Sequence, residues 1–121
     1  MAHLAEFEAT PAGTERRASS GSDWTSASVG DLLYNDHESR NKQGNAYQVR
    51  LYPEVGIFFD SPTTVFLSNL SGPVKYKPAG GNWTWASDGA QYTALVVGTG
   101  PGGSVSVVCS AQGTYKPKPW P

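Results

Sequence analysis

Cysteine is close to absent from this sequence, with Cys109 as its single occurrence in 121 residues. One cysteine cannot form an intrachain disulfide, and it excludes a metal site built from four cysteine ligands. In the run SVSVVCS, Cys109 shares a strand face with Val105 and Val107. Because buried cysteine is common and inert, we predict that this thiol packs in the core and is not reactive.

Charge and long apolar runs are also scarce. Charged residues make up 16% of the chain and the net charge is −1, which predicts no electrostatic attraction to nucleic acid or to an anionic membrane. No stretch approaches the ~20 apolar residues of a membrane helix, and the N-terminus lacks the basic start and apolar run of a secretory signal. We therefore expect a protein made in the cytoplasm, with neither nucleic acid nor membrane as a partner.

Arrangements of residues that carry catalysis are missing as well. His3 lies in a polar N-terminal segment, and in NDHES the consecutive side chains around His37 point in different directions, whereas a site needs convergence. There is no G-x-S-x-G motif, and the acids Glu54, Asp60 and Asp88 have no spacing that supports paired-carboxylate hydrolysis. We therefore predict a non-enzymatic protein with no cofactor and no metal site.

Glycine and proline, by contrast, are plentiful, with 14 and 9 residues respectively. From residue 46 onward, short runs of β-branched and aromatic residues alternate with turns rich in Gly, Pro and Asp. This pattern predicts an all-β protein: a small antiparallel sandwich or barrel, for which an immunoglobulin-like topology is one candidate. The predicted strands are AYQVRLY, VGIFF, TTVFL, PVKYK, NWTWA, QYTALVV and SVSVVCS, with DSP and PAGG as turns.

Both ends of the chain differ from this central region. Residues 8–31 are small and polar, and alone they cannot bury enough surface to offset the entropy of ordering them. We therefore expect a polar N-terminal arm over 1–33, a single sandwich domain over 34–115 and an extended Pro-rich tail over 116–121. The prolines of YKPKPWP predict a polyproline-like tail that cannot join a central strand.

Polar arms of this kind favour a structural function. Arms and tails that become ordered only in an assembly add contacts between subunits without needing a second core. We therefore predict a virion component, such as a phage capsid decoration or cement protein or another head or tail structural protein, that clamps neighbouring subunits or copies of itself. The large apolar residues of the extensions would anchor those contacts, namely Leu4, Phe7, Trp24 and Trp120.

The pair Trp83 and Trp85 supports an alternative function. In a strand, both indoles stand on one face, where they would either pack into the core or form a platform that stacks on sugar rings. Alternation with polar neighbours favours core packing. If the face is exposed, a carbohydrate-binding, lectin-like module is the alternative, with a surface formed by Tyr76, Asn82, Trp83, Trp85 and Tyr92 and a further polar contact from Asp88. An adaptor whose KPKPWP tail docks into an aromatic groove is a third possibility.

Overall fold

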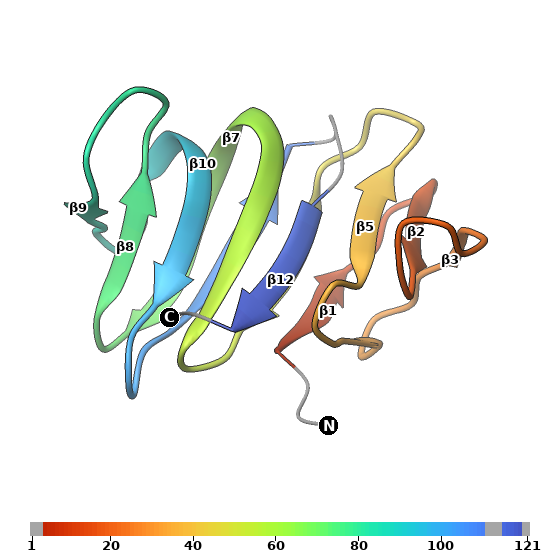
Figure 1. Cartoon of the computed structure of the whole chain (residues 1–121), viewed down its shortest axis with the longest axis horizontal. Coiled ribbons are helices and arrows are strands. Elements are labelled where there is room, and N and C mark those ends of the chain that lie inside the picture. Colours follow the sequence, from red (N-terminus) through yellow and green to blue (C-terminus); the bar gives the residue numbers. More distant parts are fainter. Residues whose placement is uncertain (1–3, 111–114, 120–121) are drawn as a thin grey trace.

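The chain folds into β-structure, which confirms the all-β prediction. The computed structural model describes residues 4–110 and 115–119, and these contain strands and no helix (Figure 1). None of the described residues lies in a helix long and apolar enough to cross a membrane. The strands are β1 (Ala5–Ala9), β2 (Thr14–Arg17), β3 (Thr25–Ser26), β4 (Leu32–Leu33), β5 (Glu38–Asn41), β6 (Tyr47–Leu51), β7 (Val55–Ser71), β8 (Val74–Lys77), β9 (Thr84–Trp85), β10 (Gln91–Thr99), β11 (Ser104–Cys109) and β12 (Tyr115–Pro119).

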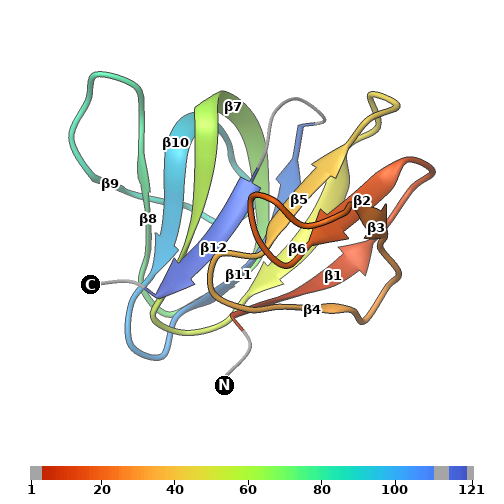
Figure 2. The same ribbon diagram turned by 45° about the vertical axis from the view of Figure 1, so that its right-hand side comes forward.

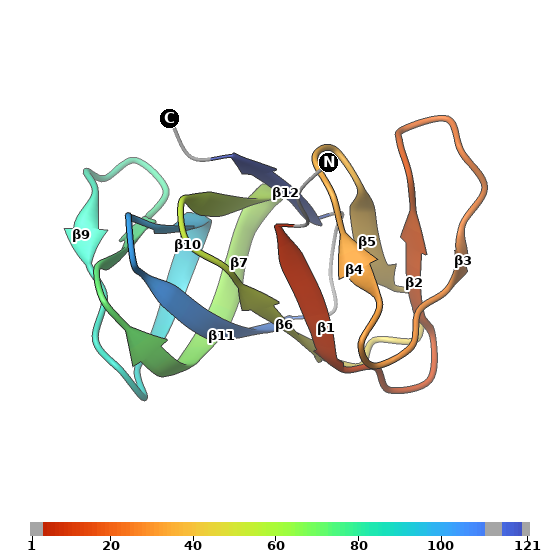
Figure 3. The same ribbon diagram turned by 90° about the horizontal axis from the view of Figure 1, so that it is seen from below.

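Antiparallel pairing arranges these strands in two layers of a sandwich. The layer at the front of Figure 1 has the order β9-β8-β10-β7-β12-β5-β2-β3. The layer behind it has the order β4-β1-β6-β11-β7-β10 (Figure 2, Figure 3). The first part of β7 pairs with β12 and its second part with β11, so β7 belongs to both layers. The core between them includes Phe7, Leu33, Tyr47, Val49, Leu51, Ile57, Val65, Leu67, Val97, Val107 and Tyr115.

The hairpin predicted at PAGG joins β8 to β9, whereas the turn predicted at DSP does not occur. The exposed residues Asp60, Ser61 and Pro62 lie within β7, and β10 continues beside them with a register shift between Ala94 and Val96. A bulge of this kind bends a strand and increases its twist. The chain therefore passes from one layer to the other without reversing direction.

The N-terminal segment is part of the sandwich, so the expectation of a free arm over 1–33 is wrong for its described residues. Strand β1 pairs with β6 and β4, and β2 pairs with β5 and β3. Leu4 is 9% exposed and Phe7 is fully buried, so these two predicted interface anchors are core residues instead. The polar composition misled the prediction because β1 needs only alternate apolar residues, while β2 is held mainly by its backbone ladder and by ion pairs.

The C-terminal segment also joins the sandwich. Strand β12 lies between β7 and β5, contrary to the expectation that prolines would keep it out of the sheet. The carbonyl oxygen of Pro117 accepts a hydrogen bond from the backbone N of Asp36, so residue 117 turns its backbone groups away from β7. A missing N–H at alternate positions of β12 therefore costs no bond to β7. Trp120, the fourth predicted anchor, lies outside the described residues.

Cys109 is fully buried in β11, as predicted from its alternating neighbours. Burial raises the pKa of its thiol well above the ordinary value, so the reactive thiolate is strongly disfavoured.

The strand order shows an internal duplication. Each layer reads the same from either end: β3-β2-β5-β12 mirrors β9-β8-β10-β7 at the front, and β4-β1-β6 mirrors β10-β7-β11 at the back. The register agrees, because Phe7 pairs with Val49 in β1 and β6 just as Leu67 pairs with Val107 in β7 and β11. The first half of the molecule therefore runs from β1 to the first part of β7, and the second half from there to β12.

Backbone hydrogen bonds outside the regular ladders repeat in the same way. Ala27 N donates to Thr14 O at 3.0 Å, and Ala86 N donates to Val74 O at 2.9 Å. The other matching bonds are Gly30 N to Phe7 O and Gly89 N to Leu67 O, then Phe7 N to Asp31 O and Leu67 N to Ala90 O. Two pieces of sequence share this local geometry, DWTSASVG at 23–30 and NWTWASDG at 82–89. The β2–β3 and β8–β9 hairpins are thus equivalent, and they occupy opposite ends of the front layer (Figure 1).

Candidate functional site

The two tryptophans of the second hairpin are exposed. Trp85 is 64% exposed and Trp83 is 41% exposed, so the prediction of core packing is wrong. The reason is the position of β9, a strand of two residues that pairs with β8 at the end of the front layer. The alternation of apolar and polar residues around Trp83 and Trp85 therefore marks an outer face of the sheet and not a core face. An exposed Trp83/Trp85 face is the feature that favours the carbohydrate-binding alternative.

The other residues of the predicted aromatic surface differ from the two tryptophans in exposure or in their contacts. The rings of Tyr76 and Tyr92 stack with centroids 4.0 Å apart and are half-buried against the core. The Tyr92 hydroxyl accepts a hydrogen bond from the backbone N of Ser87 at 2.9 Å, so this pair supports the hairpin from beneath. Asn82 is exposed in the loop before β9. Asp88 accepts a bond from the Leu70 backbone N at 3.2 Å and so fixes the following turn.

Trp85 forms one wall of a cavity of about 390 Å³. The floor is the outer face of β8 and β10, where Lys75 and Gly98 are directly paired. The turn before β7 brings Glu54 to the rim. The residues that line the cavity are Glu54, Pro73, Lys75, Trp85, Gly98, Thr99, Gly100 and Pro101. A volume of this size matches the small-molecule sites of proteins at their lower end.

Charged groups of both signs line this cavity. The Lys75 ammonium lies 4.9 Å from the Trp85 ring centroid, which keeps the indole next to a positive charge. None of the ion pairs between described residues includes Lys75 or Glu54. Glu54 is exposed and Lys75 is half-buried. The Thr99 hydroxyl donates to Tyr52 O at 2.7 Å and accepts from Val55 N at 3.0 Å, so it holds the wall of the cavity.

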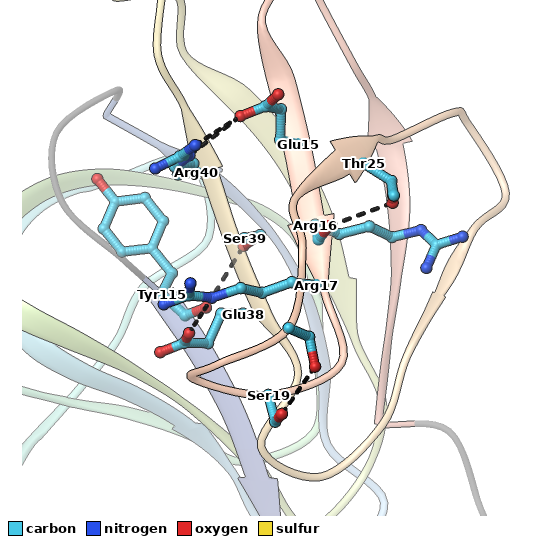
Figure 4. Close-up of polar contacts among 10 residues, drawn as sticks. Glu15, Arg16, Arg17, Ser19, Thr25, Glu38, Ser39, Arg40 and Tyr115 are labelled. Atoms are coloured by element: carbon cyan, nitrogen blue, oxygen red, sulfur yellow. Dashed lines mark hydrogen bonds and ion pairs between the residues drawn. The ribbon is translucent and has the colours of Figure 1, made fainter.

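The equivalent position in the first half is filled by the chain itself. The Trp24 ring, which is half-buried, lies over the guanidinium carbons of Arg17 and Arg40 at 4.4 and 4.1 Å. Figure 4 shows both arginines paired with acids of the neighbouring strand. The distances are 2.6 Å from Arg17 Nε to Glu38 Oε1 and 3.0 Å from Arg40 Nε to Glu15 Oε1.

These ion pairs shift the pKa of one of their acids. Burial alone would raise the pKa of the Glu15 carboxyl, but hydrogen bonds from Arg40 and Lys42 hold it below its ordinary value. Trp24, a predicted interface anchor, is therefore engaged by cations of its own half. Whether it also contacts a partner stays a prediction.

Register identifies which residues of the two halves correspond. Arg40 pairs with Glu15 in the first half, while Gly98 pairs with Lys75 in the second. The arginine side chain that fills the first site thus has no counterpart in the second, which leaves the cavity open. The full correspondence on the outer face is Glu15 with Lys75, Arg17 with Lys77, Ser26 with Trp85, Glu38 with Val96 and Arg40 with Gly98.

No protein-family model, curated protein or solved structure matches the chain. Within residues 4–110 and 115–119 there is no group of three or more metal-ligating side chains.

Sequence reasoning found Trp85 but missed the rest of the cavity. Glu54, Lys75 and Gly98 were not predicted as site residues, because they are distant in sequence and carry no motif. One signal was available: the repeat of Trp-Thr-x-Ala-Ser-x-Gly at 24–30 and 83–89. That repeat would have placed Trp24 and Trp83 in equivalent hairpins and directed attention to the positions where the two copies differ.

Proposed function

We propose that this protein is a non-enzymatic carbohydrate-binding module whose ligand enters the cavity beside Trp85. The observation that carries the proposal is an indole that is 64% exposed and forms the wall of an open cavity. A large aromatic side chain left in water loses the stabilisation that burial would give it. A bound pyranose ring offsets that loss, because its apolar C–H face stacks on the indole.

Polar groups around the indole suit the hydroxyls of such a ring. The Lys75 ammonium is a donor and the Glu54 carboxylate is an acceptor, so together they can bind neighbouring hydroxyl groups. Gly98 has no side chain, which allows a sugar to approach the backbone of β10. The few charged groups set against one aromatic wall fit a ligand with one apolar face and a polar rim.

Titration calorimetry with a panel of oligosaccharides tests this proposal, using wild type and the Trp85→Ala variant. We expect the substitution to lower affinity by about fivefold, since an aromatic stacking contact contributes on the order of 1 kcal/mol. Val29→Ala is the matched control, because Val29 is 66% exposed and lies in the first half, away from the cavity. Equal binding by Trp85→Ala and wild type, or no binding to any saccharide, would contradict the proposal.

The assembly function stays a second proposal with less support. Its anchors Leu4 and Phe7 are core residues, and the segment expected as a clamping arm contributes strands to the sandwich. A virion or capsid role would therefore use the outer surface of the sandwich. Light scattering on the purified chain tests self-association, and a strict monomer at high concentration would exclude a lattice built from this chain alone.

A further inference from the structure

The second hairpin carries a second indole next to the one that lines the cavity. Trp83 is 41% exposed and precedes the 64% exposed Trp85 by two residues. Register pairs Trp85 with Lys75 of β8 and, continued by two residues, places Trp83 opposite Lys77. Side chains two residues apart in an extended chain stand about 7 Å apart on the same face. Both indoles therefore belong to the outer face of the front layer.

The first half shows how the fold places an indole at the Trp83 position. Its counterpart there is Trp24, because the repeated backbone hydrogen bonds align the two hairpins. The guanidinium carbons of Arg17 and Arg40 lie over the Trp24 ring, 4.4 and 4.1 Å from its centroid, so this ring turns a face toward the outer side chains of the sheet. In the second half, Arg40 is replaced by Gly98. The indole at this position is then 41% exposed instead of half-buried.

The cavity and Trp83 lie on opposite sides of Trp85. The turn residues Pro73 and Gly100 line the cavity, and Gly100 N donates to Pro73 O at 3.0 Å. Pro73 immediately precedes β8, whereas Trp83 lies opposite the last residue of that strand, Lys77. A ligand that stacks on Trp85 in the cavity and extends past this indole therefore reaches Trp83.

From this arrangement we infer that the ligand is an oligosaccharide of at least two units, with one ring on Trp85 and the next on Trp83. This inference rests on the proposed carbohydrate-binding function. A single sugar contacts one indole, whereas a chain adds a second stacking contact. Because the two rings are covalently joined, binding of the first raises the effective concentration of the second. Trp83 thus selects for chain length, and stacking requires no charge on the ligand.

NMR chemical-shift titration of the full chain tests this inference, since it detects weak binding. The probes are glucose and cellobiose, and N-acetylglucosamine and its β-1,4-linked disaccharide. In the series that binds, we expect the disaccharide to bind about fivefold more tightly than the monosaccharide, and we expect Trp83→Ala to remove this difference. Trp85→Ala should weaken binding of both.

Each other outcome has a defined meaning. If the wild type binds the monosaccharide as tightly as the disaccharide, or if Trp83→Ala leaves disaccharide binding unchanged, this inference is overturned and the proposed function stands. An equal loss of mono- and disaccharide binding in Trp83→Ala would also overturn it, because the indole would then act on the first ring. Absence of binding to every saccharide would overturn both proposals.

Two further variants separate stacking from an effect on the conformation of the hairpin. Trp83→Tyr keeps an aromatic face and should retain most of the disaccharide preference. Thr84→Ala is the matched control, because Thr84 is exposed, lies between the two indoles and points to the other face of β9. It should leave both affinities unchanged. A loss in either variant as large as that in Trp83→Ala would show that hairpin conformation and not the indole controls binding, which would contradict the inference.

Discussion

At the scale of single residues, the two halves differ most at one pair of positions. Arg40 contacts Trp24, the counterpart of Trp83, whereas Gly98, the counterpart of Arg40, has no side chain and lines the cavity beside Trp85. A second difference accompanies it, because the exposed Trp85 stands where the first half has Ser26. Leu4 and Phe7, two apolar residues in a polar segment, are core residues and not interface anchors.

The core position of Phe7 leads to a stability prediction. Its ring is fully buried and lies 6.0 Å from the Tyr47 ring, so truncation leaves a cavity between the layers. Phe7→Ala should lower the free energy of unfolding by about 3–5 kcal/mol. Urea denaturation followed by tryptophan fluorescence measures this change. Val29→Ala, at an exposed position, should change it by less than about 0.5 kcal/mol, and an equally small effect of Phe7→Ala would show that residues 4–9 are not part of the core.

At the scale of elements, the strands between residues 46 and 109 were predicted from their apolar pattern, except that VGIFF and TTVFL belong to the single strand β7 and that β9 has only two residues. The prediction failed where pairing depends on distant sequence. Strands β1 and β2 are polar and short, and they form because β6 and β5 offer them an edge. Likewise, β12 joins β7 because its prolines occupy alternate positions, which local propensity cannot reveal. The aromatic wall of the site was predictable as one strand face, but its exposure depends on the place of β9 at the edge.

Ion pairs along β2 and β5 predict the response of the fold to acid. The pKa of Glu15 is lowered from 4.5 and that of Asp31, which accepts a bond from Ser28 N and pairs with Arg16, is lowered from 3.8. A carboxyl whose pKa is lower in the folded state binds protons more readily when unfolded. The stability from both groups is therefore complete above those ordinary values and is lost as pH falls through the folded pKa values.

Urea midpoints at about pH 7 and about pH 3 test this direction. The wild type should lose stability on acidification, and Glu15→Gln should lose less, because its contribution is already absent at neutral pH. Glu8→Gln is the control, since Glu8 is exposed and belongs to no ion pair among the described residues. A pH dependence in Glu15→Gln as steep as in the wild type would show that Glu15 is not responsible.

At the scale of the whole molecule, duplication predicts that a second site can be built. The variant Glu15→Lys, Ser26→Trp and Arg40→Gly gives the first half the residues that the second half has at equivalent positions. The stoichiometry of saccharide binding should rise from one to two per chain. Loss of the partly exposed Glu15–Arg40 pair should cost at most about 1 kcal/mol, so the fold should persist. An unchanged stoichiometry in a variant that is folded by circular dichroism would show that these three positions do not define the site.

Because the two halves are fused in one chain, each half can carry substitutions that the other lacks. Two identical subunits related by a two-fold axis share every mutation, so a change that opens a site in one opens it in both. The continuous strand β7, which ends the first half and begins the second, ties the copies together and lets each acquire its own substitutions. The first half holds a closed set of matched charges that favours stability, while the second half has lysine, valine and glycine at the positions equivalent to Glu15, Glu38 and Arg40. A scaffold and a binding surface can thus be divided between the two halves of one sandwich.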